Sequence, residues 1–308
     1  MNYRECYERG CSALNDAGIE DATLDARLLL EHVCGTNRND LLVHGDRPME
    51  PEREERYFQL IAKRSKRIPL QHLTGVQDFM GLEFQVNEHV LIPRQDTEVL
   101  VEEVLKELHD GMHILDMCTG SGCILISLLH YSNDCSGVGV DISEEALRVA
   151  WKNSERILSE ANSENVLGSD GVTENQCWEA GTQDDGVATT QATFLRSNLF
   201  ENVTGKYEII VSNPPYICSN VIPTLMPEVK DYEPMQALDG MADGLFFYRK
   251  IVEESRNYLT GGGMLYFEIG YDQAEAVSGL MQDAGFTEIN VVKDYEGLDR
   301  VVYGTLVK

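Results

Sequence analysis

Apolar and polar positions follow a helical period at the start of the chain. In "DATLDARLLLEHVCG", residues 21–35, apolar side chains recur at helical spacing, and the run stops at Gly35, a residue typical of helix ends. The segment "EREERYFQLIAKRSKR", residues 52–67, is acidic at its start and basic at its end, which suits the helix dipole. The pattern predicts an N-terminal all-helical domain over residues 1–73.

The second of these helices ends in a dense basic cluster, Lys63–Arg67. The cluster could contact a partner, or it could be a solvated helix end that the dipole favours. The second interpretation is preferred, because basic residues are common in the last turn of helices that have no partner.

The period changes after the helical domain. Residues 74–93 hold short β-prone runs punctuated by glycine, which predicts a β-hairpin that links two domains. Over residues 94–308, helical and strand patterns alternate, beginning with a helix that Asp96 or Thr97 is expected to cap. Such alternation predicts an α/β domain with a doubly wound, mostly parallel sheet covered on both faces.

Residues 159–193 interrupt this alternation. They show no periodicity and carry seven Asp and Glu residues but no Lys or Arg. A long, acidic segment of this kind is typical of a poorly ordered surface insertion, and no function is assigned to it.

Composition limits the classes of partner. The formal net charge of −27 opposes a general attraction to a nucleic-acid backbone, and it is interpreted as serving solubility. The eight cysteines include no C-x-x-C pair, which favours reduced thiols in a cytoplasmic protein over a zinc site. The N-terminus lacks an apolar signal core, and no apolar run approaches the roughly 20 residues that cross a bilayer. We therefore expect a cytoplasmic protein without a metal, direct DNA binding or a membrane contact.

A glycine-rich turn follows the first strand expected in the α/β domain. In "LDMCTGSGCI", residues 115–124, Gly120 and Gly122 let the backbone approach a ligand closely. The turn is neither a G-x-G-x-x-G fingerprint nor a P-loop. Asp141 ends the next apolar strand, where an acid can accept both ribose hydroxyls of an adenosine or can cap the following helix. Together, the turn and the acid predict an adenosine cofactor, either a nicotinamide dinucleotide or S-adenosylmethionine.

The stretch "YEIIVSNPPY", residues 207–216, is an apolar strand that stops at two prolines. Pro214 and Pro215 prevent further sheet or helix, so the Asn213 amide is held at the carboxyl end of the strand. The Asn213 oxygen and the Pro214 carbonyl can accept both N–H bonds of a planar NH₂ group, which directs the nitrogen lone pair at an electrophilic methyl. Tyr216 can stack on that group. The stretch favours S-adenosylmethionine.

Five segments, in order along the chain, resemble one family. They are "LTGVQDFMGLEFQVNEHVLIPRQDTEVLVE", "LDMCTGSGCI", "VSNPPYI", "YEPMQALDGMADGL" and "EIGYDQAEAV…GLDRVVYG". They resemble the HemK/PrmC family of peptide chain release factor N5-glutamine methyltransferases nearly end to end, apart from the acidic insertion. The resemblance implies a Rossmann-like class I methyltransferase domain over residues 94–308 and an N-terminal domain that helps to bind the release factor. It implies S-adenosyl-L-methionine as cofactor, and as substrate the glutamine of the Gly-Gly-Gln motif in class 1 release factors.

The resemblance also implies roles for individual residues, in a cofactor group and a substrate group. The cofactor group consists of Cys118, Thr119, Gly120, Ser121 and Gly122 at the methionine part, Asp141 at the ribose, Asn198 and Leu199 at the adenine, and Asn213. The substrate group consists of Asn213, Pro214, Pro215, Tyr216 and Arg94, of which Asn213, Pro214 and Tyr216 are the implied catalytic residues. Asp116 and Glu268 are implied as acids behind the site, unless they are only structural.

Three positions depart from the family pattern. Cys118 stands where the family usually has Gly, so a positive φ there would be strained. Asn198 stands where the family often has Asp, which keeps an acceptor oxygen but loses the charge. The motif "PRQDTE" replaces the commoner "PRPETE".

Other functions stay open at this point. The sibling enzymes that methylate a glutamine of ribosomal protein L3 also tend to carry Cys in the glycine turn, whereas "DTEVLVE" and "GLDRVVYG" favour the release-factor enzymes. A DNA adenine N6-methyltransferase shares "NPPY" but fits poorly with the net charge of −27. A translation-associated module could bind S-adenosylmethionine without turnover, but the intact Asn213 and Tyr216 argue against it.

Overall fold

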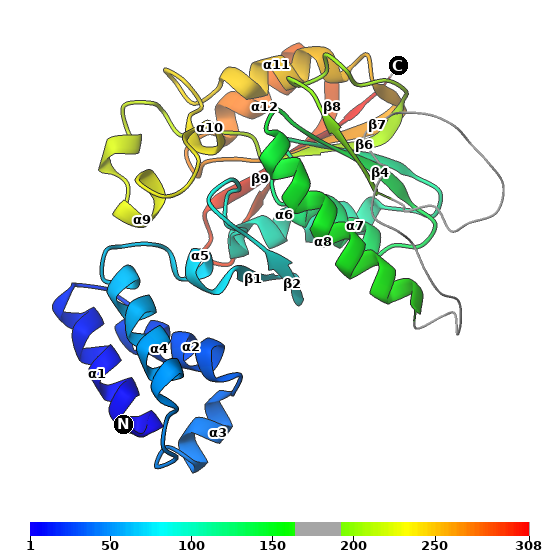
Figure 1. Ribbon diagram of the computed structural model, residues 1–308. Helices are drawn as coiled ribbons and strands as arrows, with labels where there is room; N and C mark the ends of the chain where they lie inside the picture. The colour runs from blue at the N-terminus through cyan, green and yellow to red at the C-terminus, as the bar shows by residue number, and fades with distance from the viewer. Residues whose placement is uncertain (164–191, 308) are drawn as a thin grey trace.

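The computed structural model describes residues 1–163 and 192–307, and these form a small helical lobe and a larger α/β lobe (Figure 1). The N-terminus lies in the helical lobe, and the C-terminus lies at the far side of the α/β lobe. The helical lobe consists of α1 (Tyr3–Asp16), α2 (Ala22–Cys34), α3 (Arg38–Val43), α4 (Pro51–Arg64) and α5 (Leu70–Thr74). Leu14, Leu29 and Tyr57 are fully buried in a core of its own. The prediction that the chain begins with helices is confirmed.

A seven-stranded sheet forms the centre of the α/β lobe, in the order β5-β4-β3-β6-β7-β9-β8. Its strands are β3 (His113–Met117), β4 (Ser136–Asp141), β5 (Ala192–Arg196), β6 (Tyr207–Ser212), β7 (Leu259–Glu268), β8 (Phe286–Lys293) and β9 (Asp299–Leu306). Strands β3 to β7 pair in parallel, and β9 pairs antiparallel with β7 and β8. The helices are α6 (Gln95–Glu107), α7 (Cys123–His130), α8 (Glu144–Ser163), η1 (Ile222–Thr224), α9 (Pro227–Lys230), α10 (Met235–Leu238), α11 (Phe246–Ser255) and α12 (Ala274–Asp283). The α/β class with a mostly parallel sheet is confirmed.

Strand side chains alternate between two cores, because successive strand residues face opposite sides of a sheet. On β3, Ile114 packs into the core with α6, α7 and α8, while Leu115 packs into the core with α11 and α12. Helices therefore cover both faces of the sheet (Figure 1). The strand order reverses between β3 and β6, which places a crevice at their carboxyl ends.

The predicted hairpin is formed by β1 (Val76–Phe79) and β2 (Leu82–Gln85), which pair antiparallel. Phe79 and Phe84 are buried in the same core as α6 and α7. The Asn153 side chain on α8 accepts a hydrogen bond from Gln85 N at 2.7 Å and donates one to Gln85 O at 3.0 Å. The hairpin thus packs into the α/β lobe.

The interpretation of Lys63–Arg67 as a solvated helix end is wrong for two of its residues. Arg64 is buried, and its Nε donates to Asp25 at 2.6 Å while its Nη1 donates to Glu228 at 3.0 Å. Arg67 Nη1 donates to the same Glu228 oxygen at 3.1 Å. Two basic groups are used because a carboxylate that is removed from water needs partners.

The predicted cap of α6 is also wrong. Arg94 is the N-cap residue, and no side-chain hydrogen bond caps this helix. Asp96 instead pairs with Arg300 at 3.2 Å, and Thr97 is buried. Both side chains are thus engaged with other parts of the fold.

The acidic insertion is shorter than predicted at both ends. Helix α8 continues to Ser163, and β5 begins at Ala192, so the ends of the 159–193 segment belong to regular elements. Residues 164–191 lie outside the described residues. Within the described residues, all seven cysteines are free thiols, and every helix is too short or too polar to span a bilayer.

Candidate active site

A cavity of about 720 Å³ opens at the carboxyl ends of β3, β4 and β6. Its volume lies in the range of pockets that hold cofactors. The predicted site residues that line it are Arg94, Cys118, Thr119, Gly120, Ser121, Asp141, Asn198, Leu199, Asn213 and Pro215. The structure therefore brings most of the predicted cofactor and substrate residues to one place.

Three predicted residues lie outside this wall. Gly122 is the N-cap of α7 with φ of 80°, a backbone conformation that favours glycine, and a Cβ there would lie close to Ile126 and Ala150. Pro214 is buried, and the Tyr216 hydroxyl donates to Glu268 Oε1 at 3.3 Å. The roles of these three residues stay predictions.

The Asp141 carboxylate joins the turn after β3 to the start of α8. Gly120 N donates to one Asp141 oxygen at 3.0 Å, and Ser143 N donates to the other at 2.9 Å. Ser143 Oγ accepts from Ala146 N at 3.1 Å, so Ser143 rather than Asp141 caps α8. Burial raises the pKa of Asp141, while hydrogen bonds from the backbone of Ser143, Gly120 and Ile142 lower it. A carboxylate has about four lone-pair sites, which leaves Asp141 the capacity to accept ribose hydroxyls.

Asp116 holds the same turn from inside the protein. Its Oδ2 accepts from the Thr119 hydroxyl at 2.6 Å and from Leu125 N at 3.3 Å. Burial raises the pKa of Asp116 to about 7, although these hydrogen bonds act against the shift. Asp116 therefore shapes the turn without lining the cavity.

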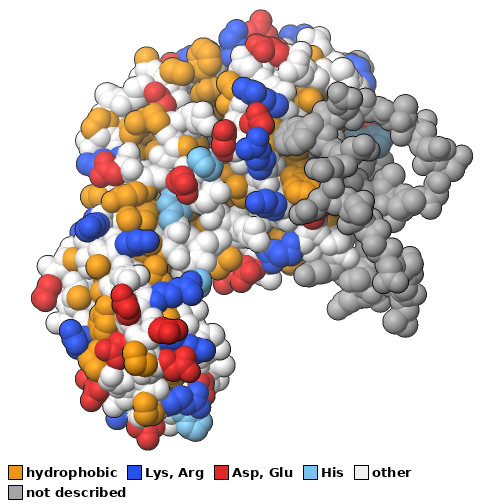
Figure 2. Space-filling model, in the orientation of Figure 1, with side chains coloured by type: hydrophobic (Ala, Val, Ile, Leu, Met, Phe, Trp, Pro, Cys, Tyr) orange, Lys and Arg blue, Asp and Glu red, His pale blue; other side chains and the backbone are white. Residues whose placement is uncertain are grey.

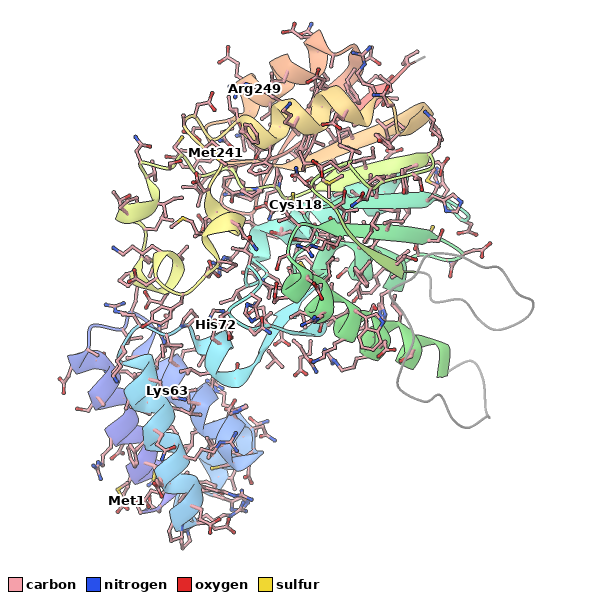
Figure 3. All side chains as sticks on the ribbon, turned by 45° about the horizontal axis from the view of Figure 1, so that its top comes forward. Met1, Lys63, His72, Cys118, Met241 and Arg249 are labelled. Atoms are coloured by element: carbon pink, nitrogen blue, oxygen red, sulfur yellow. The ribbon has the colours of Figure 1, made fainter. Side chains whose placement is uncertain are left out.

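Backbone strain gathers around the cavity. Of the seven described non-glycine residues with positive φ, three line it: Cys118 at 64°, Leu199 at 50° and Met241 at 71°. The positive φ expected at Cys118 is thus present. Figure 3 places Cys118 at the strand ends, on the side that faces the segment carrying Met241. Burial raises the pKa of the Cys118 thiol far above its usual range, so the thiol stays protonated. Strained residues of this kind concentrate at binding sites.

Asn198 and Leu199 form the edge of the cavity after β5. Asn198 is exposed, and its Nδ2 donates to Glu201 Oε1 at 2.7 Å. This contact leaves the Asn198 oxygen as the group for a ligand, and an amide oxygen suits a ligand amine because it is an acceptor.

Asn213 directly follows β6 and reaches the cavity wall. Its Nδ2 donates to Thr97 Oγ1 in a long hydrogen bond of 3.4 Å, across 116 residues of sequence. No described residue donates to the Asn213 oxygen, so that oxygen remains available to a ligand. Sequence reasoning considered Thr97 only as a helix cap; its place directly after the acid in "RQDTE" was the available signal.

The prolyl loop is backed by the segment that precedes α11. Ile217 N donates to Leu238 O at 3.0 Å, and Gly240 N donates to Ile217 O at 2.8 Å. Gly244 has φ of 71°, and a Cβ there would lie 2.4 Å from Tyr216 O. The loop that carries Asn213 is therefore fixed by contacts on both of its sides.

Arg94 supports the segment before α10 rather than the prolyl loop itself. Its Nη2 donates to both oxygens of Glu233, at 2.7 and 2.6 Å, and Ile92 N donates to Glu233 at 3.3 Å. The Glu233 side chain is 1% exposed, so this carboxylate depends on Arg94 for its charge partner. Burial raises the pKa of Glu233, while Arg94 lowers it. Sequence reasoning missed Glu233, although it directly precedes Pro234 in the quoted segment "YEPMQALDGMADGL".

The segment between β6 and α11 is also attached to the helical lobe. Besides the Glu228 contacts with Arg64 and Arg67, the Tyr232 hydroxyl donates to Lys66 O at 2.7 Å. Burial acts to raise the pKa of Glu228, but hydrogen bonds from the backbone and from both arginines outweigh it, and the pKa is lowered. Figure 1 shows α9 facing the helical lobe. The lobe thus contacts the segment that forms one wall of the cavity.

The charges of the wall distinguish between adenosine cofactors. Among the described residues that line the cavity, Arg94 is the single Lys or Arg, and Glu233 already engages its guanidinium. A pyrophosphate would lack a cationic partner there. A Cβ on Gly120 would meet no atom within 4 Å, so ligand can approach the backbone closely. The cavity fits S-adenosylmethionine better than a nicotinamide dinucleotide.

Known proteins are similar to this chain over nearly its whole length. A family model described as the PrmC N-terminal domain matches residues 5–75. The release factor glutamine methyltransferase of Geobacter sulfurreducens is 38% identical over 294 residues, which cover 95% of this chain and 93% of that protein. That of Clostridium botulinum is 38% identical over 304 residues, which cover 98% of each. The solved structure of a release-factor-specific protein-(glutamine-N5) methyltransferase from Alicyclobacillus acidocaldarius is 26% identical with a TM-score of 0.38, and the match covers 73% of this chain and 100% of that one.

Proposed function

The chain belongs to the family of release factor glutamine methyltransferases, and from this membership we propose that it methylates the side-chain amide nitrogen (N5) of the glutamine in the Gly-Gly-Gln motif of class 1 release factors. Its cofactor is S-adenosyl-L-methionine. One observation carries the proposal. Asn213 directly follows β6 at the cavity wall, with Nδ2 bound to Thr97 and its oxygen left for a second amide. The cytoplasm, where release factors act, is the proposed compartment.

The cofactor half of the cavity has the groups that this cofactor needs. S-adenosyl-L-methionine supplies a methyl group on a positively charged sulfur. The turn Cys118–Gly122 is proposed to hold its amino-acid end, Asp141 to accept its ribose hydroxyls, and Asn198 and Leu199 to contact its adenine. These contacts fix the cofactor along the carboxyl ends of β3, β4 and β5.

The substrate half positions a weak nucleophile. An amide nitrogen reacts poorly because its lone pair is delocalised into the carbonyl group. The Asn213 oxygen and the Pro214 carbonyl are proposed to accept the two N–H bonds of the glutamine, which directs the lone pair at the methyl. Tyr216, held by Glu268, is the proposed stacking partner of the planar amide. The nitrogen loses its proton to water after transfer, so the chain needs no general base.

The rim of the cavity suits a protein substrate. Met235, Met241 and Phe246 line the cavity, and these residues remain 54%, 44% and 39% exposed. Figure 2 shows hydrophobic side chains on the side of the α/β lobe where α9 and α10 lie in Figure 1. Exposed apolar groups beside a polar site are typical of protein contacts. We propose that this rim receives the Gly-Gly-Gln loop and that the helical lobe contacts the rest of the release factor.

Mass spectrometry of the methylated product tests the proposal. Purified, unmethylated release factor is incubated with the enzyme and S-adenosylmethionine, then digested, with ribosomal protein L3 in a parallel reaction and a cofactor-free reaction as control. We expect one added methyl on the glutamine of the Gly-Gly-Gln peptide and none on L3. Methylation of L3 alone, or cofactor binding with no transfer to either protein, would overturn the proposal.

A further inference from the structure

Glu268 is a buried acid that the proposed reaction uses only to hold Tyr216. It ends β7 and is 2% exposed, and its Oε1 accepts from the Tyr216 hydroxyl at 3.3 Å. Its Oε2 has no hydrogen-bond partner among the described residues. A buried oxygen without a partner destabilises a fold, so an acid at this position needs a compensating role.

The neighbouring charges do not neutralise Glu268 by contact. The Arg300 guanidinium is already shared between two aspartates, of which Asp96 lies at 3.2 Å. Arg300 favours ionisation of Glu268, and Asp96 opposes it. The other titratable groups near Glu268 are Tyr248 on α11 and Cys123 on α7, and burial raises the pKa of both, so they are neutral near pH 7. The hydroxyl groups around Glu268 are therefore its main partners.

Thr97 connects Glu268 to Asn213. Thr97 is buried on α6, and its Oγ1 accepts from Asn213 Nδ2 at 3.4 Å. The Thr97 hydroxyl also acts on Glu268, because its hydrogen bonding lowers the pKa of that carboxyl. The Thr97 hydroxyl thus has two partners. It is a hydrogen-bond donor toward the Glu268 carboxyl and the acceptor for the Asn213 amide at the cavity wall.

Because the Thr97 hydroxyl has a single hydrogen, it determines which group donates and which accepts in the hydrogen bonds that link Glu268, Thr97 and Asn213. An ionised Glu268 can only accept, so it takes the Thr97 hydrogen and leaves the Thr97 lone pairs to accept from Asn213 Nδ2. The Asn213 oxygen then faces the cavity as an acceptor. If the Asn213 amide turned over, its oxygen would compete with Glu268 for the Thr97 hydrogen, and an NH₂ group would face the substrate NH₂. The two donors could not bond.

We propose that Glu268 and Thr97 are positioning residues that hold the Asn213 amide with its oxygen toward the substrate glutamine, and that the ionised form of Glu268 is the active one. The inference rests on the proposed function, since it assumes a substrate that donates N–H bonds. The inference explains why an acid stands at position 268, although a buried carboxyl with an unpaired oxygen destabilises the fold. It also predicts that methyl transfer depends on the charge of a residue that does not line the cavity.

The pH dependence of the rate follows from the environment of Glu268. Burial raises the pKa of Glu268 to about 7, against the opposing effects of Thr97 and Arg300. We therefore expect kcat at saturating cofactor to rise with pH through about 7. Asp116 also has a pKa raised to about 7, but it lies behind the cofactor turn, so its ionisation changes cofactor affinity, which saturation compensates.

The test compares kcat-against-pH profiles of wild type, Glu268→Gln, Thr97→Val and Thr97→Ser on release factor, with cofactor affinity measured by calorimetry. Glu268→Gln keeps the size but not the charge, and Thr97→Val keeps the size but not the hydroxyl. We expect each to lower kcat about tenfold, the effect of losing one hydrogen-bond partner, with cofactor affinity kept. Thr97→Ser should recover most of the loss, and Glu268→Gln should abolish the rise through pH 7.

Stability separates positioning from a structural role. The folded-state pKa of Glu268 lies above its ordinary value of 4.5, so its stabilising effect is full below that value and is lost as pH rises through about 7. Glu268→Gln should therefore be at least as stable as wild type above pH 7, although it is less active. A purely structural Glu268 would give lower stability and lower activity together.

The outcomes distinguish the inference from the proposed function. If wild type methylates the release factor but Glu268→Gln keeps the same pH profile and rate, or if Thr97→Val is as active as wild type, the inference is wrong and the function stands. If wild type does not methylate the release factor at all, the proposed function is wrong and the inference falls with it.

Discussion

The cofactor half of the cavity and its substrate half differ in how far apart along the chain their contacts lie. In the cofactor half, Gly120 and Asp141 are joined across 21 residues, within one strand–turn–helix–strand unit. In the substrate half, Asn213 and Thr97 are joined across 116 residues. The contact between the turn and Asp141 therefore forms within this local unit, whereas the contact between Asn213 and Thr97 requires distant parts of the α/β lobe to be assembled. We therefore expect substitutions in the cofactor half to change mainly cofactor affinity, and substitutions in the substrate half to change mainly kcat.

Asn213→Ala should have the largest effect, and only on the substrate half. It should lower kcat about 10³-fold, as expected when a preorganised hydrogen-bonding group is removed beside a reacting centre. Cofactor affinity should change less than about threefold, because the turn and Asp141 are intact. Parallel calorimetry and transfer assays measure both, with Asn220→Ala, an exposed residue of the same loop, as control. An unchanged kcat would remove Asn213 from the mechanism.

The same difference explains what could be predicted from the sequence. The glycine turn and Asp141 are close in sequence and sit at strand ends, so their meeting in the cofactor half was predictable from strand–helix alternation. Thr97 as the partner of Asn213 and Glu233 as the partner of Arg94 were not predictable. Periodicity assigns a residue to a helix or strand, but it does not say which distant side chain that residue contacts. The prediction that Arg64 is solvated was wrong for the same reason, since its partner Glu228 lies 164 residues away in another lobe.

Asp141→Asn should show the opposite pattern. The amide replaces an acceptor-only group, so hydrogen bonds to a charged oxygen are lost, and cofactor affinity should fall about 10- to 100-fold. At saturating cofactor, kcat should stay near the wild-type value because the Asn213 contacts are unchanged. Calorimetry gives the affinity, and Asp110→Asn, an exposed substitution of the same kind, is the control. A large loss of kcat at saturation would mean that the halves are coupled.

Arg94→Ala tests the support of the substrate half through stability. It leaves Glu233 buried without its cation, and urea unfolding at pH 8 should show a loss of about 2–3 kcal/mol. The deficit should shrink as pH falls, because protonation of Glu233 removes the unpaired charge. Arg94→Ala combined with Glu233→Gln should recover part of the loss. Additive effects of the two substitutions would contradict the pairing.

Glu228→Gln tests whether the attachment of the helical lobe serves the substrate half. Weakening the contacts with Arg64 and Arg67 should raise KM for full-length release factor about threefold, the effect of one weakened charged hydrogen bond. The kcat/KM for a short Gly-Gly-Gln peptide should stay unchanged, since such a peptide does not reach the helical lobe. Equal losses on both substrates would show that Glu228 acts on the cavity instead.

Cys118→Gly should have the smallest effect. Glycine relieves the strain of a positive φ, worth about 1–2 kcal/mol, but costs about 0.5–1 kcal/mol in chain entropy, so stability should rise by at most about 1.5 kcal/mol. Cofactor affinity should change less than about threefold. Thermal unfolding and calorimetry measure these values. A marked loss of cofactor affinity would show that the thiol itself contacts the ligand.

The orientation of the Asn213 amide is tested most directly by neutron diffraction from a complex with S-adenosylhomocysteine and a Gly-Gly-Gln peptide, because neutrons locate amide hydrogens that X-rays leave to inference. We predict that the Asn213 oxygen accepts from the glutamine nitrogen at about 3 Å. We also predict that Asn213 Nδ2 donates to Thr97 and that the Thr97 hydrogen points to Glu268. An Asn213 NH₂ group facing the peptide, or a side chain turned out of the cavity, would contradict the account.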